Sequence, residues 1–203
     1  MVTSIEIFLL TLLFSLPLGL LVAGGRMSSF GPIRWLIKIY ISIMRGTPLM
    51  LQLIIVFFAP YYVFGMSLSA DYRFIAVIIA FTINYAAYFA EIYRGGIESI
   101  NSGQYEAAQV LGYTKLETFF IIIMPQVFKV ILPSVTNEVI TLVKDTSLSF
   151  VIAIPEMFTV AKQIAAADAS IAALLVAGIF YYVFNVLVAF VMEYFEKRLD
   201  YYE

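Results

Sequence analysis

Long apolar runs separated by short polar breaks dominate this chain. A helix needs about 20 mainly apolar residues to cross the hydrocarbon core of a bilayer, and several runs approach that length. The pattern therefore predicts an all-α integral membrane protein with about five transmembrane helices. The predicted spans are residues 5–23, 48–64, 74–93, 127–143 and 171–192.

The second apolar region, residues 36–64, is longer than one span requires. The sequence Arg45-Gly46-Thr47-Pro48 interrupts it. We therefore begin the second span after this break and predict that residues 33–44 form a helix that approaches it at the membrane interface.

Small residues recur near the C-terminal third of the chain. Alanines at every fourth position let helix backbones approach closely in lipid. We favour packing inside one subunit over a seam between two subunits. These alanines are Ala161, Ala165, Ala169, Ala173 and Ala177.

Composition supports the membrane interpretation: 63% of the residues are hydrophobic and 13% are charged, with a mean hydropathy of +0.96. A soluble domain is about half apolar and about a quarter charged, and a soluble fold of this composition would expose large apolar patches. The net charge of -2 leaves no footprint for nucleic acid. Because the chain has no Cys and no His, it lacks thiolate and imidazole chemistry, and we expect no metal site and no catalytic site.

Basic residues in the short loops predict the orientation, because cytoplasmic loops carry an excess of Lys and Arg. Their distribution predicts a cytoplasmic C-terminus, and an odd number of spans then puts the N-terminus outside. The first basic residue follows the first apolar run, whereas a signal peptide would carry positive charge before it. The basic residues assigned to the cytoplasmic side are Arg26, Arg34, Lys38, Arg45, Arg94, Lys115, Lys197 and Arg198.

The segment of residues 95–120 is the most polar long stretch. Ser102 can cap a helix there, Glu106 lies in or near its first turn, and Gly112 can end it. We predict a short polar helix under the membrane that can insert into a groove of a cytoplasmic partner. The alternative is a solvated helix that only connects two spans.

A longer motif runs through this segment: E-A-A, three residues, G, nine residues, I, one residue, then L-P. This stretch resembles the signature loop of ABC importer permeases, with Met124 in place of the usual Leu. Three further stretches resemble the polar amino acid permeases of that family: Arg45-Gly46-Thr47-Pro48-Leu49, residues 87–97 and residues 125–148. The matching motif positions are Glu106, Ala107, Ala108, Gly112, Ile122 and Pro125.

The resemblance implies a type I ABC importer permease, a single transmembrane domain of residues 1–203 in a prokaryotic cell membrane. Its expected function is the import of polar amino acids, with basic ones among the candidates. In that family Glu106, Ala107, Ala108 and Gly112 belong to the loop that docks on the ATPase subunit. The resemblance also implies a second permease subunit, expected as a homodimer, and an extracytoplasmic solute-binding protein. The chain has no G-x-x-x-x-G-K-[ST] phosphate loop, so ATP is expected to be used by a separate subunit.

Polar residues inside predicted spans are candidates for a solute pathway, because ionisable groups at bilayer depth usually face a bundle interior or a water-filled cavity. Glu91 is set apart, because an ion pair with Arg94 is the favoured interpretation there. Interface solvation is an open alternative for the residues at positions 144 and 145. A channel, a secondary transporter and a membrane enzyme are the alternative functions. The candidate pathway residues are Asn84, Tyr88, Glu138, Thr141, Lys144 and Asp145.

Overall fold

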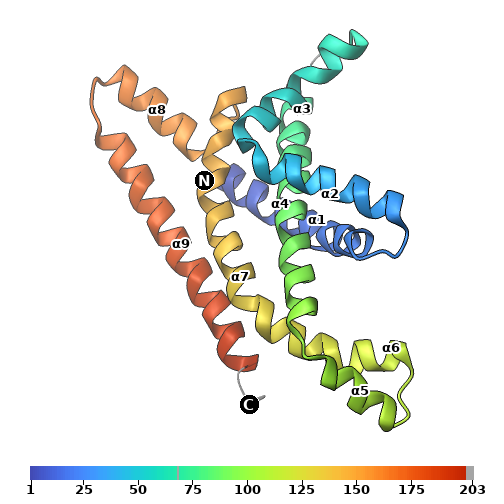
Figure 1. The fold of residues 1–203 in the computed structure, drawn as a ribbon. Coiled ribbons are helices and arrows are strands. Elements are labelled where there is room, and N and C mark those ends of the chain that lie inside the picture. The colour runs from blue at the N-terminus through green and yellow to red at the C-terminus, as the bar shows by residue number, and fades with distance from the viewer. Residues whose placement is uncertain (68, 200–203) are drawn as a thin grey trace.

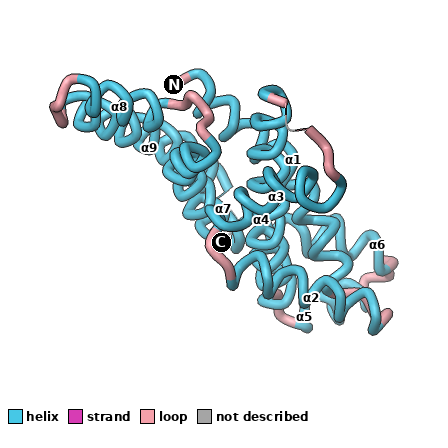
Figure 2. The backbone as a smooth tube through the Cα atoms, turned by 90° about the horizontal axis from the view of Figure 1, so that it is seen from above, coloured by secondary structure: helices cyan, strands magenta, loops and turns pink. Residues whose placement is uncertain are grey.

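A computed structural model describes residues 1–67 and 69–199. Within these ranges the regular structure is entirely helical, and short loops join the helices (Figure 2). The elements in chain order are α1 Val2–Arg26, α2 Gly31–Gly46, α3 Leu49–Phe64, α4 Ala70–Ser99, α5 Ser102–Val110, α6 Lys115–Glu117, the π-helix η1 Thr118–Ile123, α7 Met124–Asp145, the 3-10 helix η2 Thr146–Ile152, α8 Met157–Ala167 and α9 Ala172–Leu199.

Four stretches of helix are long and apolar enough to cross a membrane, namely α1, most of α4, the continuous stretch Lys115–Ile152 that contains α7, and most of α9. Helices α2 and α3 meet at an angle of 111° and pass the same test only as a bent pair. The expectation of about five spans is therefore confirmed when this pair is counted as one. The observed helices run past the predicted ends because polar residues at the ends of a span need not stop a helix.

Helix α4 lies at the centre of the described fold, with α1, α3 and α7 packed around it (Figure 1). Its N-terminus is capped by Ser69, whose hydroxyl accepts a hydrogen bond from the amide of Tyr72 at 3.1 Å. Phe81, Tyr85 and Phe89 are its largest buried side chains. They recur every fourth residue, so one face of α4 supplies much of the core.

Two glycines allow α4 to approach its neighbours closely. A Cβ atom on Gly19 of α1 would lie 2.8 Å from the Cβ of Phe89. A Cβ atom on Gly96 would lie 2.1 Å from Cγ2 of Ile131 on α7. Such small residues are typical of helix contacts in membranes, where close packing replaces the hydrophobic effect as the source of stability.

The molecule has two distinct ends. Helices α5 and α6 lie at the same end as the C-terminal turn of α9, and α8 lies at the opposite end (Figure 1). Glu156, which is fully buried, caps α8: its carboxylate accepts hydrogen bonds from the amides of Phe158 and Thr159 at 2.8 and 2.6 Å. The hydroxyl of Tyr181 donates to the same carboxylate at 2.9 Å, which fixes the start of α8 to α9.

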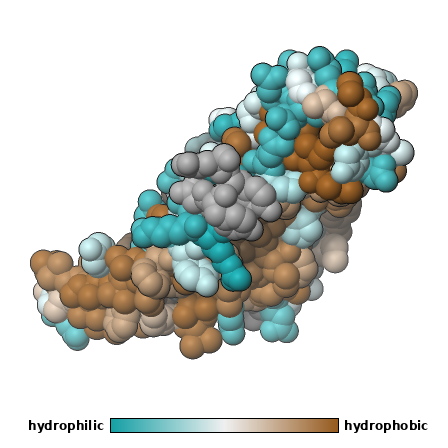
Figure 3. Space-filling model, turned by 90° about the horizontal axis from the view of Figure 1, so that it is seen from below, coloured by the Kyte–Doolittle hydropathy of each residue, from teal (hydrophilic) through white to brown (hydrophobic). Residues whose placement is uncertain are grey.

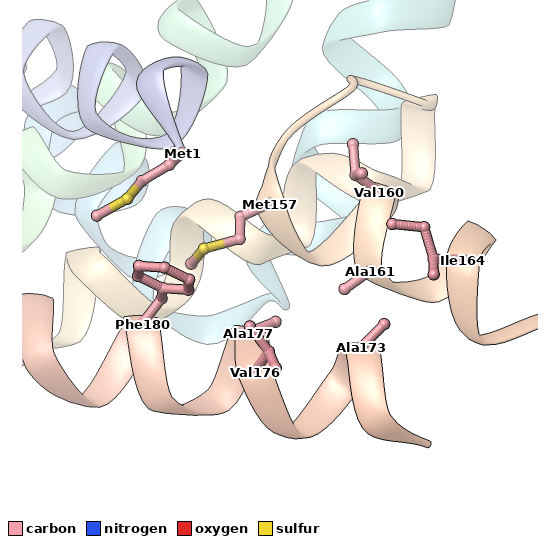
Figure 4. Close-up of a pocket in the computed structure, with 9 residues that line it drawn as sticks. All are labelled: Met1, Met157, Val160, Ala161, Ile164, Ala173, Val176, Ala177 and Phe180. Atoms are coloured by element: carbon pink, nitrogen blue, oxygen red, sulfur yellow. The ribbon is translucent and has the colours of Figure 1, made fainter. Parts of the chain in front are cut away.

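The alanine stripe does not lie on one continuous helix, because the chain turns between α8 and α9. Ala161 on α8 and Ala177 on α9 are both buried, and with Ala173 they line an apolar cavity of about 350 Å³ between the two helices (Figure 4). Ala161 and Ala177 thus pack within the chain, and for the other alanines of the stripe packing inside one subunit stays a prediction.

Candidate functional site

A cavity of about 400 Å³, here called the central cavity, lies where the α2–α3 corner, α4 and α7 meet. Polar and apolar side chains share its surface, whereas the cavity between α8 and α9 is lined by apolar residues alone. A polar solute therefore has a surface to bind only in the first of these two. The residues that line the central cavity are Thr47, Pro48, Leu49, Asn84, Tyr85, Tyr88, Glu138, Thr141, Asp145 and Leu148.

Five of the six residues predicted for a solute pathway line this cavity together: Asn84, Tyr88, Glu138, Thr141 and Asp145. The sixth, Lys144, is exposed and is not among the lining residues. The difference follows from helix geometry, because positions 138, 141 and 145 share a face of α7 and position 144 is turned away from it. The geometry brings these residues together, and their role in transport stays a prediction.

The α2–α3 corner closes one side of the cavity through buried amide side chains. Gln52, at 6% exposure, donates from Nε2 to the carbonyl oxygens of Met44 and Thr47 at 2.9 and 3.1 Å. Asn84 donates from Nδ2 to the same Met44 oxygen at 3.1 Å and to Oε1 of Gln52 at 2.9 Å. These bonds satisfy carbonyl groups that the end of α2 leaves without helical partners.

The corner residues are the part of the site that sequence reasoning missed. Thr47 and Pro48 stand in the motif that we used only to identify a resemblance, and Gln52 was not singled out. The sequence did contain a signal for Gln52, because it is the one amide side chain in the uncharged, apolar run of α3. A polar residue inside a span usually has a specific hydrogen-bond partner.

Two carboxylates give the cavity its charge. Asp145 accepts a hydrogen bond from the hydroxyl of Tyr85, with 2.7 Å between the oxygens. Glu138 is half-buried, and in the described part of the chain no hydrogen-bond donor contacts it. Among residues 1–67 and 69–199, no Lys or Arg lines the cavity. The surface is therefore suited to a cation or to the ammonium group of a zwitterion.

One arginine lies beside the cavity without lining it. The guanidinium of Arg45 lies 5.3 Å from the centre of the Tyr88 ring, a cation–π distance. Arg45 also interacts electrostatically with Glu138 and lies 3.9 Å from the carboxylate of Glu91. It therefore joins the charges of the cavity to those of a second cluster.

Glu91 is the centre of that second cluster. The predicted ion pair with Arg94 is confirmed, at 2.7 Å between Nη2 and Oε2. Arg26, at the end of α1, approaches the same carboxylate at 3.7 Å. Arg94 also pairs with Glu98 one turn farther along α4. The C-terminal ends of α1 and α2 and the C-terminal part of α4 are thus tied to one carboxylate.

The segment between α4 and α7 contains the predicted short helix, α5. Its cap differs from the prediction: Asn101, rather than Ser102, accepts the hydrogen bond of the Gly103 amide at 2.8 Å, and Glu106 lies just past the first turn. Asparagine and serine are about equally favoured as N-caps, so the sequence alone could not decide between Asn101 and Ser102.

Gly112 ends α5 as predicted, with a positive φ of 82°. The amide of Gly112 donates to the carbonyl of Gln109 and that of Tyr113 to the carbonyl of Ala108, both at 3.0 Å. This pair of bonds is a Schellman motif, in which a left-handed residue reverses the chain after a helix. Thr114 and Glu117 then form a capping box that starts α6.

Apolar side chains are exposed around this reversal. Val110 is 88% exposed, Leu111 74% and Leu116 71%. Seen from this end of the molecule, hydrophilic surface gathers over α5 and α6 with a hydrophobic patch among it (Figure 3). Glu106 and Ala107 are exposed as well, whereas Ala108 is buried. Exposed apolar groups within a polar surface are typical of a site that another protein covers.

Comparison with known proteins agrees with these observations. Residues 15–201 match the family described as binding-protein-dependent transport system inner membrane component. Similar sequences include the L-cystine transport system permease protein TcyB of Bacillus subtilis, 37% identical over 98% of this chain and 84% of that protein. The arginine transport system permease protein ArtQ of the same organism is 35% identical over 97% of this chain and 89% of that protein. The glutamate/aspartate import permease protein GltK of Escherichia coli is 32% identical over 98% and 91%.

Solved structures show the same fold. The crystal structure of an amino acid ABC transporter with histidines superimposes with a TM-score of 0.88 at 31% sequence identity, covering 98% of this chain and 91% of that chain. The MetNI methionine ABC transporter superimposes with a TM-score of 0.75 at 15% identity, over the same shares of the two chains.

Proposed function

The chain belongs to the family of binding-protein-dependent transport system inner membrane components, and we propose that its central cavity carries polar amino acids, with basic ones preferred. As a member of this family it is a multi-pass membrane subunit of an amino acid ABC importer, and it is not the ATPase. Its relatives are named for cystine, arginine and glutamate or aspartate, so the family alone does not select the solute.

The observation that carries the proposal is the pair of carboxylates in the central cavity. Glu138 and Asp145 lie about two turns apart on α7, and among the described residues no basic side chain lines the cavity with them. Carboxylates held away from water need a partner charge. The ammonium group of an amino acid supplies one positive charge, and a lysine or arginine side chain supplies a second.

The carboxylate of the solute needs a different environment, because Lys144 lies outside the cavity. We infer that the start of α3 provides it. The first amides bonded within this helix are those of Leu51 and Gln52, both to the carbonyl of Pro48, so the amides of Leu49 and Met50 have no helical acceptor. Helix N-termini attract anions, and Arg45 lies nearby on the other side of the corner.

The exposed segment around α5 supports the proposed partners. We propose that α5 and α6 face the cytoplasm and dock on an ATPase subunit through Val110, Leu111 and the neighbouring polar residues. The C-terminus then lies in the cytoplasm and the N-terminus outside. A second permease subunit and an external solute-binding protein complete the proposed importer, and the partner subunit uses the ATP.

Transport in proteoliposomes tests the proposed solute. The chain is reconstituted with its ATPase subunit and solute-binding protein, and ATP-dependent uptake of labelled arginine, glutamine and glutamate is compared. We expect arginine to be carried best, and Glu138→Gln to reduce arginine uptake more than glutamine uptake. Asp168→Asn, which removes a carboxylate charge at the exposed end of α8 outside the cavity, serves as the matched control.

Two results would contradict the proposal. Unchanged selectivity in Glu138→Gln would mean that the cavity does not select the solute and that the solute-binding protein alone does so. Uptake that continues without ATP would instead favour a channel or a secondary transporter.

A further inference from the structure

Helix α2 has one face that packs on the rest of the chain and two that do not. Ile37, Tyr40, Ile41 and Met44 pack against a small core formed by α1 and α4. The hydroxyl of Tyr40 donates to the carbonyl of residue 83 on α4, which fixes this face in place. The remaining surface of α2 is free to contact something outside the chain.

One of the free faces is apolar. Its side chains are between 37% and 62% exposed, and Trp35 is the most exposed of them. Trp and large aliphatic residues on one side of a helix are typical of a helix that lies at the surface of a bilayer. The residues of this face are Trp35, Leu36, Ile39 and Ile43.

The other free face is basic. Arg34 and Lys38 lie one turn apart and are both exposed, and α2 contains no acidic residue. In the part of the chain that the structure describes, no carboxylate forms an ion pair with either of them. Arg45, at the end of the helix, is already engaged by Glu91 and Tyr88.

The N-terminal half of α2 suits the membrane boundary better than the interior of the bilayer. Helices α2 and α3 have 16 residues each and span about 24 Å, so neither crosses the roughly 30 Å of the hydrocarbon core alone. They meet at 111° (Figure 1), and because α3 carries no charge while α2 carries Arg34 and Lys38, the start of α2 is the part of the bent pair that suits the boundary. Arg34 and Lys38, in the N-terminal half of α2, then lie at the level of the lipid headgroups.

We propose that Arg34 and Lys38 bind the phosphate of an anionic phospholipid whose acyl chains lie against the apolar face around Trp35. Two cations one turn apart can both reach a single phosphate group. A soluble acidic partner would leave the apolar face in water. A second copy of this helix offers no acidic residue to pair with the cations. Charge and apolar area are both satisfied by one lipid, whichever solute the protein carries.

The chain itself contains the probe for this site, because Trp35 is its only tryptophan. We would reconstitute the full chain in phosphatidylcholine liposomes that contain a small fixed fraction of lipid brominated on its acyl chains. The brominated lipid is either phosphatidylcholine or phosphatidylglycerol with identical chains. Each basic residue at the membrane surface raises the local concentration of an anionic lipid by about five-fold. Quenching of Trp35 fluorescence should therefore be at least about two-fold stronger with brominated phosphatidylglycerol than with brominated phosphatidylcholine.

The double variant Arg34→Gln/Lys38→Gln should abolish this difference, and Lys162→Gln on α8 should preserve it. Raising the salt concentration should reduce the difference in the unchanged protein, which tests the charges without any substitution. Equal quenching by the two lipids would overturn the proposal, as would a difference that persists in the double variant. Absence of quenching by either lipid would overturn it too, because another protein surface would then cover α2.

Discussion

The hydroxyl of Tyr85 donates a hydrogen bond of 2.7 Å to Asp145, and this bond joins the middle of α4 to the end of α7 across the wall of the central cavity. Removing the hydroxyl in Tyr85→Phe keeps the ring that packs in the core but leaves the carboxylate without its donor. We expect a loss of about 1–3 kcal/mol in stability, the usual cost of an unsatisfied buried polar group. Thermal unfolding of the purified protein measures it.

Tyr182→Phe is the control, because Tyr182 is 70% exposed on α9. An equal effect of both substitutions would mean that the bond to Asp145 does not contribute to stability.

Thr141→Val tests whether the hydroxyl in the cavity contacts the solute. The hydroxyl of Thr141 donates to the carbonyl of Asn137 at 2.9 Å, so only its lone pairs are available to the cavity. We expect the solute concentration that gives half-maximal ATPase stimulation to rise by about three- to ten-fold, as for the loss of one hydrogen bond.

Ser147→Ala is the matched control for Thr141→Val, because the Ser147 hydroxyl makes the same kind of bond, to the carbonyl of Lys144, outside the cavity. If the solute dependence is unchanged in both variants, Thr141 does not belong to the solute site.

Gly112→Val should misplace the segment that we propose to dock on the ATPase subunit. A β-branched residue at a φ of 82° is strained, so the reversal after α5 cannot keep its geometry. We expect normal membrane insertion with ATP hydrolysis no longer tied to transport, measured as solute-stimulated ATPase and uptake in parallel.

Asparagine tolerates the left-handed region, so Gly112→Asn should retain most of the coupling. Normal transport by the Val variant would show that the reversal is not required for docking.

Single cysteines test the proposed orientation, because the chain has no cysteine of its own. Cysteine at position 71 or 162 should react with a membrane-impermeant thiol reagent applied to intact cells, and cysteine at position 106 or 197 should react only after permeabilisation. Labelling of position 106 from outside would reverse the orientation and remove the basis for docking at α5.

Much of the site could be predicted because it follows the repeat of a single helix. Glu138, Thr141 and Asp145 share one face of α7, and Asn84 and Tyr88 share one face of α4, so helical spacing was enough to group each set. The ends of the spans were less predictable, since α1 and α9 continue through polar residues that remain helical outside the apolar run.

The rest depends on contacts between helices, which no single repeat encodes. Gln52 meets Asn84 only because α3 turns back after the break at Pro48. Arg45 reaches Tyr88 and Glu91 for the same reason. Lys144 was grouped with Thr141 on an overlapping helical face. It is rotated about 100° around the helix from Asp145, and this rotation turns its side chain away from the cavity.

The carbonyl of Met44 accepts hydrogen bonds from both Gln52 and Asn84, so these two side chains have a structural role in the cavity wall formed by α3 and α4. The amide groups of Gln52 and Asn84 hold the bend between α2 and α3 through these bonds, so substitutions of either residue would disturb the bend. Glu138 and Thr141 on α7 make no bond to the corner, whereas Asp145 is held by Tyr85. If the cavity selects the solute as we propose, a new solute preference can arise through substitutions at these two positions of α7 while the opposite wall is inherited unchanged.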